Sequence, residues 1–346
     1  MSHERQVMSI TYAFDARPND GETLNVAEDI EWLRMPLPFS LNHINLWLLR
    51  DDGGWAIVDT GVGTDETITI WHSVFADAMR GDPASHIIAT HMHPDHVGCA
   101  GFLVRHFDVE FWMPRDEYMM CRILVADTGR DAPPEGIDFY KDAGFADDQL
   151  HAYQSAFGMF GKFVKHLPEA YNRLSDSDQL VIGGHTWEII TGAGHSPEHA
   201  CLFDRDRNLL ISGDQLLPTI SSNVSVWPTE PHANPLQDWF DALRRLRAII
   251  PQDVLVLPAH GKPFRGAHER IDAMIREHEE RLDILRTFCR EPRRAVDVFP
   301  AIYRTKISDQ NRIMATGEAL AHLAFLVKSG ELSTENREAV TWYKAL

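Results

Sequence analysis

Cysteine is scarce in this chain of 346 residues. It occurs four times, and no two of these cysteines form a C-x-x-C pair. A small disulfide-stabilised fold and a thiolate zinc ribbon both need more cysteines or a closer spacing, so both are excluded. Scattered free thiols are typical of a reducing compartment, and we expect a cytoplasmic protein.

Long apolar runs are also missing. No stretch approaches the roughly 18 consecutive apolar residues that a membrane-spanning helix needs. The first residues, Met1-Ser2-His3-Glu4-Arg5-Gln6, contain no apolar segment of the kind found in secretory signals. We therefore expect a soluble protein without a membrane partner.

Positive charge is in deficit, with 33 Lys and Arg residues against 51 Asp and Glu residues and a formal net charge of -18. Such a field repels phosphate backbones, so binding to nucleic acid is disfavoured unless basic residues cluster locally. The hydrophobic content of 44% is enough to fill the core of one large domain followed by a small one.

Apolar runs and turn signals predict alternating strands and helices up to about residue 265. Asp51-Asp52-Gly53-Gly54 predicts a hairpin turn between its two flanking strands. Asn234-Pro235 predicts a capped helix start. The predicted strands are 44–49, 55–58, 87–89, 111–113, 179–182, 187–191, 199–203, 209–212 and 254–257, and the predicted helices are 64–79, 97–103 and one from 235. The glycines of 97–103 predict close packing of that helix against the sheet.

Residues 114–175 interrupt this alternation and are rich in aromatic residues and methionine. They indicate a helical insertion with its own small core. An alternative is a lid whose apolar side chains line a substrate pocket. The two interpretations are compatible.

Residues 266–346 predict a small, mainly helical domain of winged-helix type. A long amphipathic helix begins near Ile271, a second covers Gln310–Leu326, and Leu332 with 339–343 suggests a β-wing. We interpret His278 as a packed or surface histidine rather than a ligand. Fold alone does not specify function, and we expect a role in packing, homodimerisation or shaping the site.

Metal-capable side chains are concentrated in Thr90-His91-Met92-His93-Pro94-Asp95-His96, between a predicted strand and a predicted helix. His91 and His93 can project to one side of an extended turn, and Asp95 with His96 points to a second position. A carboxylate beside imidazoles suits Zn²⁺, Fe²⁺ or Mn²⁺ rather than a metal that selects thiolates.

Further candidate ligands follow other apolar runs, where a rigid sheet can position them. His195 follows 187–191, Asp214 follows 209–212 and His260 follows 254–257. Asp59, after 55–58, is either a turn residue or an acceptor that orients a metal-bound imidazole. His199 is either a histidine at the start of a strand or a support for the substrate or the ligands.

This set resembles the metallo-β-lactamase-fold hydrolases. His91-x-His93-x-Asp95-His96 is similar to the family's H-x-H-x-D-H motif, and Asp59-Thr60-Gly61, His195, Asp214 and His260 follow in the family's order. The resemblance implies a first metal on His91, His93 and His195, a second on Asp95, His96 and His260, and Asp214 bridging both. It covers about 25–265.

The resemblance also implies an α/β fold, a four-layer αβ/βα sandwich over 1–265 with a winged-helix-like domain over 266–346. Asp214 is similar to the glyoxalase II and ribonuclease Z branches. Class B lactamases usually have cysteine at that position and a secretion signal, so antibiotic hydrolysis is disfavoured.

The function that we expect is hydrolysis of an ester, thioester or lactone with an apolar portion. Two divalent ions, most simply Zn²⁺, would supply a bridging hydroxide as nucleophile. Asp95 would orient this nucleophile or accept its proton. The alternatives are a phosphodiesterase or endoribonuclease of the same fold and a mononuclear iron dioxygenase.

Overall fold

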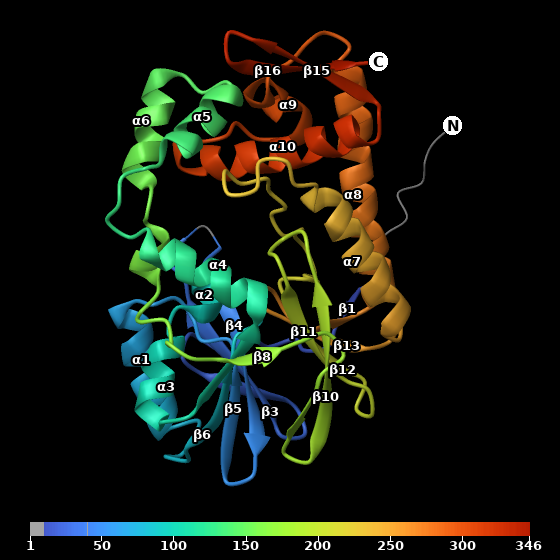
Figure 1. Ribbon diagram of the computed structural model, residues 1–346. Coiled ribbons are helices and arrows are strands. Elements are labelled where there is room, and N and C mark those ends of the chain that lie inside the picture. The colour runs from blue at the N-terminus through green and yellow to red at the C-terminus, as the bar shows by residue number, and fades with distance from the viewer. Residues whose placement is uncertain (1–9, 40) are drawn as a thin grey trace.

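The computed structural model describes residues 10–39 and 41–346, and its central feature is a pair of seven-stranded sheets (Figure 1). The first sheet has the order β2-β3-β4-β5-β6-β7-β8 and the second has the order β1-β14-β13-β12-β11-β10-β9. The first sheet comprises β2 (Thr23–Ala27), β3 (Ile30–Pro36), β4 (His43–Asp51), β5 (Gly54–Val58), β6 (Ala84–Ile88), β7 (Glu110–Pro114) and β8 (Asn172–Leu174). The second comprises β1 (Thr11–Tyr12), β9 (Gln179–Ile182), β10 (His185–Gly192), β11 (His199–Asp204), β12 (Leu209–Gly213), β13 (Leu255–Pro258) and β14 (Phe264–Arg265).

The predicted strands and their hairpin are confirmed. β4 and β5 pair antiparallel, with Asp51 opposite Gly54 across the predicted turn. β5 through β8 then run parallel, because helices and the insertion provide the crossovers between them.

Apolar side chains fill the three interfaces between four layers, which are helices, sheet, sheet and helices. This is the predicted αβ/βα sandwich. Trp47 of the first sheet and Trp187 of the second belong to the cluster buried between the sheets. The outer face of the first sheet packs against α1 (Asp65–Ala76) and α3 (Ala100–Phe107). The outer face of the second packs against α7 (Pro235–Ile249) and α8 (Ala267–Phe288).

Helix α7 begins at Pro235, as Asn234-Pro235 predicts. Its predicted apolar stripe is buried, and it consists of Leu236, Trp239, Phe240, Leu243 and Leu246. The Asn234 side chain, however, makes no capping hydrogen bond, and its Oδ1 atom is buried without a partner among the described residues. The fixed φ of Pro235 and the burial of the stripe are therefore enough to start this helix.

The single helix predicted over 97–103 is wrong, because the chain forms two shorter helices, α2 (Pro94–Val97) and α3. Gly98 lies between them, and a Cβ on it would lie 2.4 Å from the backbone nitrogen of Gly63. A Cβ on Gly101 would lie 1.4 Å from the carbonyl oxygen of His166. These glycines thus permit close contact with neighbouring backbone segments, whereas the sequence predicted contact with the sheet.

The insertion at 114–175 contains α4 (Arg115–Ala126), α5 (Pro134–Asp142), α6 (Asp147–Ala156) and the 3₁₀ turn η1 (Phe160–Phe163). Tyr140, Phe145 and Tyr153 form a small core between α5 and α6. Phe160 and Phe163 pack instead against the cluster under the first sheet. Most of the aromatic side chains therefore stabilise the insertion itself, which leaves few to line a pocket.

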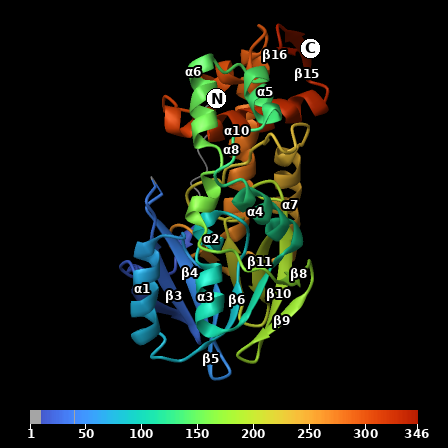
Figure 2. The same ribbon diagram turned by 60° about the vertical axis from the view of Figure 1, so that its left-hand side comes forward.

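The C-terminal region contains η2 (Ala295–Val298), α9 (Phe299–Ile302), η3 (Asp309–Asn311), α10 (Arg312–Lys328) and the hairpin of β15 (Leu332–Arg337) with β16 (Val340–Ala345). Both ribbon views place α10 and this hairpin beside α5 and α6 (Figures 1 and 2). His278 is fully buried on α8, so its packed interpretation is confirmed.

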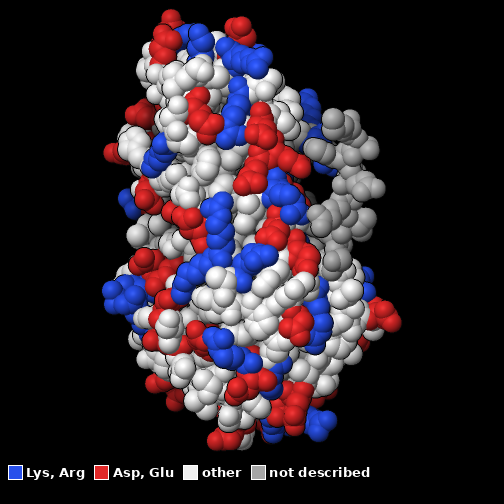
Figure 3. All heavy atoms as spheres, turned by 90° about the vertical axis from the view of Figure 1, so that its right-hand side faces the viewer, with Lys and Arg blue, Asp and Glu red and all other residues white. Residues whose placement is uncertain are grey.

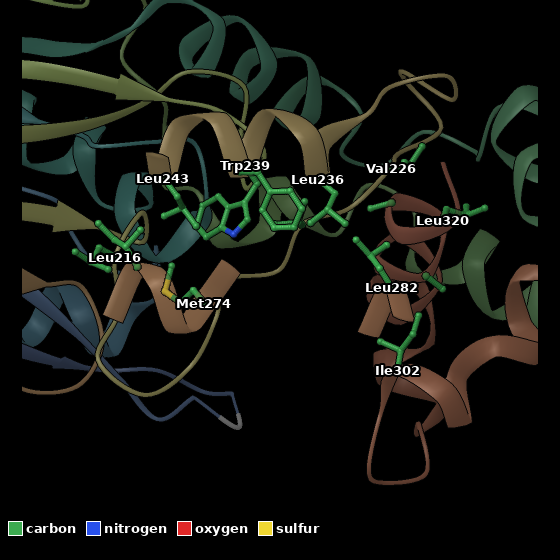
Figure 4. Packing of buried hydrophobic residues seen from close by; sticks show 14 of the residues in the cluster. Leu216, Val226, Leu236, Trp239, Leu243, Met274, Leu282, Ile302 and Leu320 are labelled. Carbon is green, nitrogen blue, oxygen red and sulfur yellow. The ribbon is translucent and has the colours of Figure 1, made fainter. Parts of the chain in front are cut away.

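One hydrophobic cluster continues from the second sheet through α7 and α8 into α10 (Figure 4). It includes Phe203 of β11, Trp239 of α7 and Leu320 of α10. The core is thus continuous across residue 265, where the sequence predicts a domain boundary. Among the described residues, no helix has both the length and the apolar character needed to cross a bilayer.

Candidate metal centre

The predicted ligands gather at one edge of the two sheets, each just beyond a strand. His91 and His93 follow β6, while Asp95 and His96 lie in the single turn of α2. The other candidate ligands follow strands of the second sheet: His195 lies after β10, Asp214 directly after β12 and His260 two residues after β13.

Three groups of three side chains form at this edge; one, of His91, His96 and Asp214, overlaps two others that share no residue with each other. The nitrogen ligands of His91, His93 and His195 all lie within 4.8 Å of one another, and so do the ligand atoms of Asp95, His96 and His260. His91 Nε2 and His93 Nδ1 are 2.8 Å apart. Each group is therefore compact enough to share one metal ion.

Asp214 lies between the two groups. Its Oδ2 atom is 3.4 Å from His195 Nε2, and its Oδ1 atom is 3.4 Å from His260 Nε2 and 3.6 Å from His96 Nε2. The two carboxylate oxygens thus face different groups, which is the arrangement that a bridging ligand needs.

The protonation states suit metal binding. Burial lowers the pKa of His93 to about 3 and that of His91 well below its usual value, so both imidazoles are neutral. Burial acts against ionisation of Asp95, but His96 and His260 outweigh it and lower the pKa of that carboxyl to about 2. Burial also opposes a charge on His96, yet Asp59, Asp95 and Asp214 raise its pKa to about 10. His91 and His93 are therefore neutral and Asp95 is ionised, whereas His96 stays protonated without a metal, and an ion bound at its Nε2 atom would replace that proton.

Several buried polar atoms here lack a hydrogen-bond partner among the described residues. They include His96 Nε2, His195 Nε2 and Asp214 Oδ1, which point into the same region. An unpaired buried polar atom costs about 1–3 kcal/mol. A cation that coordinates these atoms removes this cost, so the residues fit divalent metal ions.

Asp59 holds His96 in place. Its Oδ2 atom accepts a hydrogen bond from His96 Nδ1 at 2.8 Å, and its Oδ1 atom accepts one from the Thr90 backbone at 2.8 Å. The φ angle of Asp59 is 63°, in the left-handed region that Asp and Asn tolerate better than most residues. Because Asp59 keeps a proton on Nδ1 of His96, a metal ion would bind at Nε2 in place of the second proton.

His199 is both the first residue of β11 and a contact of the site. Its Nε2 atom accepts a hydrogen bond from the Asp214 backbone N–H at 3.0 Å. The close approach requires glycine at 213, because a Cβ there would lie 2.5 Å from His199 Nε2. His199 thus fixes the backbone that carries Asp214.

The residues that hold His260 in place were not predicted from the sequence. His260 Nδ1 donates to the His43 carbonyl oxygen at 2.8 Å, and the Gly261 N–H donates to His43 Nε2 at 3.1 Å. Asn45 donates to the carbonyl oxygens of Pro258 and Gly261, both at 2.8 Å. Only the pairing of distant segments reveals these roles, although both residues lie at the start of the predicted strand 44–49.

Glu117 of α4 is a second residue that sequence analysis missed. It is fully buried and accepts hydrogen bonds from Met92 N at 2.9 Å, Ser196 Oγ at 2.6 Å and Glu198 N at 2.7 Å. Burial raises its pKa to about 7 against the effect of these donors. Glu117 therefore connects the loop of His91 and His93 to the loop of His195. No spacing pattern in the sequence predicts this role.

The chain matches the family described as "Metallo-beta-lactamase superfamily" over residues 40–261, more than half of its length. The chain belongs to the metallo-beta-lactamase superfamily. A second family match covers residues 282–346 and is described as "Metallo-beta-lactamase-like, C-terminal domain". The predicted family and metallo-hydrolase class are thus confirmed.

Known members of the superfamily resemble the chain over much of its length. The crystal structure of a beta-lactamase domain protein from Burkholderia ambifaria is 39% identical, with a TM-score of 0.89 and coverage of 97% of this chain and 98% of that one. The probable metallo-hydrolase YqjP of Bacillus subtilis is 24% identical over 91% of this chain and 95% of its own length. Human acyl-coenzyme A thioesterase MBLAC2 is 23% identical over 69% of this chain and 81% of its own length.

Proposed function

We propose that the chain is a dinuclear metal-dependent hydrolase of thioesters, esters or lactones with an apolar acyl portion. The observation that carries the proposal is the pair of three-residue groups with the Asp214 carboxylate between them. One ion would lie on His91, His93 and His195, and the other on Asp95, His96 and His260. Zn²⁺ suits this mixture of imidazole and carboxylate ligands.

Two such ions would polarise the scissile carbonyl group and supply hydroxide at neutral pH. The residues of the chain would position the metal ligands and accept the proton of the attacking water. Asp95 is the candidate for proton transfer, because its carboxylate is ionised and its side chain is 18% exposed, against 11% for Asp214 and 3% for His260. It can therefore contact both the metal centre and a bound substrate.

The relatives favour a thioester, because MBLAC2 is named an acyl-coenzyme A thioesterase. Helix α4, whose Glu117 reaches the ligand loops, also carries Met119 and Ile123 with exposures of 49% and 53%. These two residues lie on the side of the helix opposite to Glu117, so they do not line the metal centre and give no support for an acyl chain.

Phosphodiester cleavage is the alternative, and it needs basic residues grouped near the metal centre. The three arginines of α7 are instead paired: Arg244 with Asp241, Arg245 with Asp176 and Arg247 with Asp272. In the view of Figure 3, blue and red residues alternate over the face without a continuous basic stripe. These charges favour a small acyl substrate over RNA.

The insertion and the C-terminal helices complete the proposal. Residues 114–175 carry α4, whose Glu117 contacts the ligand loops, so they would act as the substrate-selecting part of a domain over 1–265. Residues 266–346 would form the C-terminal winged-helix-like domain. α10 followed by the β15–β16 hairpin is the order of elements that this fold type requires.

The test is a substrate panel with protein loaded with Zn²⁺. We expect hydrolysis of long-chain acyl-thioesters to exceed that of short-chain thioesters, lactones, phosphodiesters and RNA. The double variant His91→Ala with Asp214→Ala should abolish turnover. RNA cleavage that exceeds thioester cleavage, or full activity in the double variant, would refute the proposal.

A further inference from the structure

Residues 214–226, here called loop 214–226, follow β12 and run beside the metal centre toward α7. The loop begins with Asp214 itself. Its Asn223 carbonyl oxygen accepts a hydrogen bond from His195 Nδ1 at 2.7 Å, and its Ser222 hydroxyl donates to the Asp214 carbonyl oxygen at 2.5 Å. The loop therefore carries one candidate ligand and orients another.

Helix α10 holds the opposite side of this loop. The Val226 N–H donates to the Gly317 carbonyl oxygen at 3.1 Å. The Asn223 side-chain amide donates to Glu318 Oε2 at 3.4 Å. Glu318 is itself fixed by Tyr303 at 2.9 Å and Arg281 at 3.2 Å. A short path of hydrogen bonds thus runs from α10 through Asn223 to His195.

The distance between α10 and the loop is set by the absence of a side chain at position 317. A Cβ on Gly317 would lie 2.7 Å from both Cβ and Oγ of Ser225 and 3.1 Å from the Val226 carbonyl oxygen. Glycine inside a helix costs about 1 kcal/mol relative to alanine. The close contact between α10 and loop 214–226, which only glycine permits, offsets this cost.

The two ends of loop 214–226 are also anchored in the shared core. Leu216 and Val226 belong to the cluster that includes Met274 of α8 and Leu320 of α10 (Figure 4). The buried Arg270 of α8 donates to the carbonyl oxygens of Leu217 and Ile220. The loop therefore has defined contacts along its whole length, which is what a precise ligand position needs.

Buried histidines extend the same contact. Ser221 Oγ is 3.0 Å from His278 Nε2, His278 Nδ1 is 3.1 Å from His322 Nε2, and His322 Nδ1 donates to the Glu318 carbonyl oxygen at 2.8 Å. His278, Glu318 and His322 are also close enough to share an ion. Every ring nitrogen already has a hydrogen-bond partner, however, and burial lowers the pKa of both histidines. The arrangement is complete as a hydrogen-bonded chain that braces the loop.

We infer that Gly317 and Glu318 of α10 are positioning residues for the metal centre, because they set the place of loop 214–226 and, through Asn223, that of His195. The inference rests on the proposed function, since it requires that the chain bind the ions. It gives the C-terminal helices a specific task, which is to keep Asp214 and His195 at the distance that metal coordination needs.

The first test is Gly317→Ala in the full-length protein, with Met314→Ala as control on an exposed position of the same helix. The substitution favours the helix by about 1 kcal/mol but forces the loop away. Competition of Zn²⁺ with a chromophoric chelator measures two binding steps, and His93→Ala and His260→Ala assign each step to its group. We expect about tenfold to hundredfold weaker binding, largest at the group of His91, His93 and His195. The Co²⁺ absorption spectrum should change as well.

The second test is Glu318→Gln, which keeps the volume of the side chain. The amide oxygen will face the Arg281 cation, so the amide nitrogen is placed against the Asn223 amide and the link is broken. The control is Glu331→Gln, because Glu331 also pairs with an arginine of α8, Arg286, but makes no contact with the loop. Adding Asn223→Asp should restore the link, and a double-mutant cycle measures the coupling. Excess Zn²⁺ should recover the activity of Glu318→Gln.

The outcomes separate the inference from the proposed function. If the wild-type protein binds no divalent ions, the proposed function fails. If it binds two and both α10 variants bind them as tightly as their controls do, only the inference fails. A variant that loses thermal stability in chelator as much as it loses metal affinity would show a merely structural role and overturn the inference. A third metal equivalent that disappears in His322→Ala would also overturn it, because the histidines would then be ligands.

Discussion

Replacing Asp59 by asparagine tests whether this carboxylate selects the metal-binding form of His96. The substitution keeps the size of the side chain and the tolerance for a φ of 63°. The amide oxygen will stay with the Thr90 N–H, 2.8 Å away in the native protein, and this places the amide nitrogen against His96 Nδ1. His96 must then accept at Nδ1 and carry its proton on Nε2, the atom that faces Asp95 and Asp214.

The expected loss of metal affinity follows from the hydrogen bond that is lost between Asp59 and His96. A buried hydrogen bond to a charged group contributes about 1.5–3 kcal/mol. Every 1.4 kcal/mol is a factor of ten, and loss of a residue that orients a ligand weakens metal binding by about tenfold to a hundredfold. Only the group of Asp95, His96 and His260 contains the altered imidazole. We therefore expect one of two binding steps to weaken and the other to persist in a chelator competition titration.

The matched control is Asp204→Asn. Asp204 is as buried as Asp59 and also accepts a backbone N–H, from Arg207 at 3.0 Å, but it lies at the far end of β11. It should lose stability in urea without a change in either metal-binding step. Native affinity at both steps in Asp59→Asn, or an equal loss at both, would refute the tautomer argument.

Four further outcomes can be checked. Gly213→Ala should weaken metal binding at least about tenfold, because its Cβ would lie 2.5 Å from His199 Nε2; native affinity would contradict this contact. Glu117→Gln should lower the free energy of unfolding in urea by about 1–3 kcal/mol, since its amide group faces a buried N–H; an unchanged midpoint would show that the carboxylate is not needed. Burial lowers the pKa values of His278 and His322, so the unfolded chain binds more protons and stability present at pH 8 is lost as the pH falls below about 6.5. The double variant His278→Gln with His322→Gln should flatten this loss in urea titrations between pH 5 and pH 8, and an equal slope would contradict the assignment. Chelation should lower the thermal midpoint and Zn²⁺ should restore it, because the ions bind only the folded arrangement; a midpoint independent of metal would speak against the site.

The strands and the clustering of the candidate ligands were predictable because both depend on local patterns. Apolar runs bounded by turn residues identify strands, and a ligand-competent residue directly after such a run identifies the site edge. His195 and His260 were found in this way although 65 positions separate them in the chain. The pattern predicts which side chains gather, since strand ends meet at one edge of a sheet.

Contacts between distant backbone segments were not predictable. Glu117 and His43 act through hydrogen bonds to main-chain atoms that lie far away in the sequence, and no spacing encodes these bonds. The glycines at 98 and 101 correctly indicated close packing, but their partner is a neighbouring backbone rather than the sheet. Composition also could not separate a core from a pocket in the insertion, because Tyr140 or Phe145 would serve either purpose equally well.

The unbroken apolar cluster through α7, α8 and α10 has a consequence for how this molecule moves. Hinge rotation between two bodies needs an interface that separates at low cost. Here, rotation of α10 away from the sheets would expose side chains such as Leu320 and Val226, at about 25 cal/mol for each Å² of apolar surface. Opening and closing of the C-terminal helices relative to the two sheets is therefore suppressed. Adjustment to substrates of different size would then come from rotamer changes of exposed side chains, which occur in picoseconds to nanoseconds and would not limit turnover.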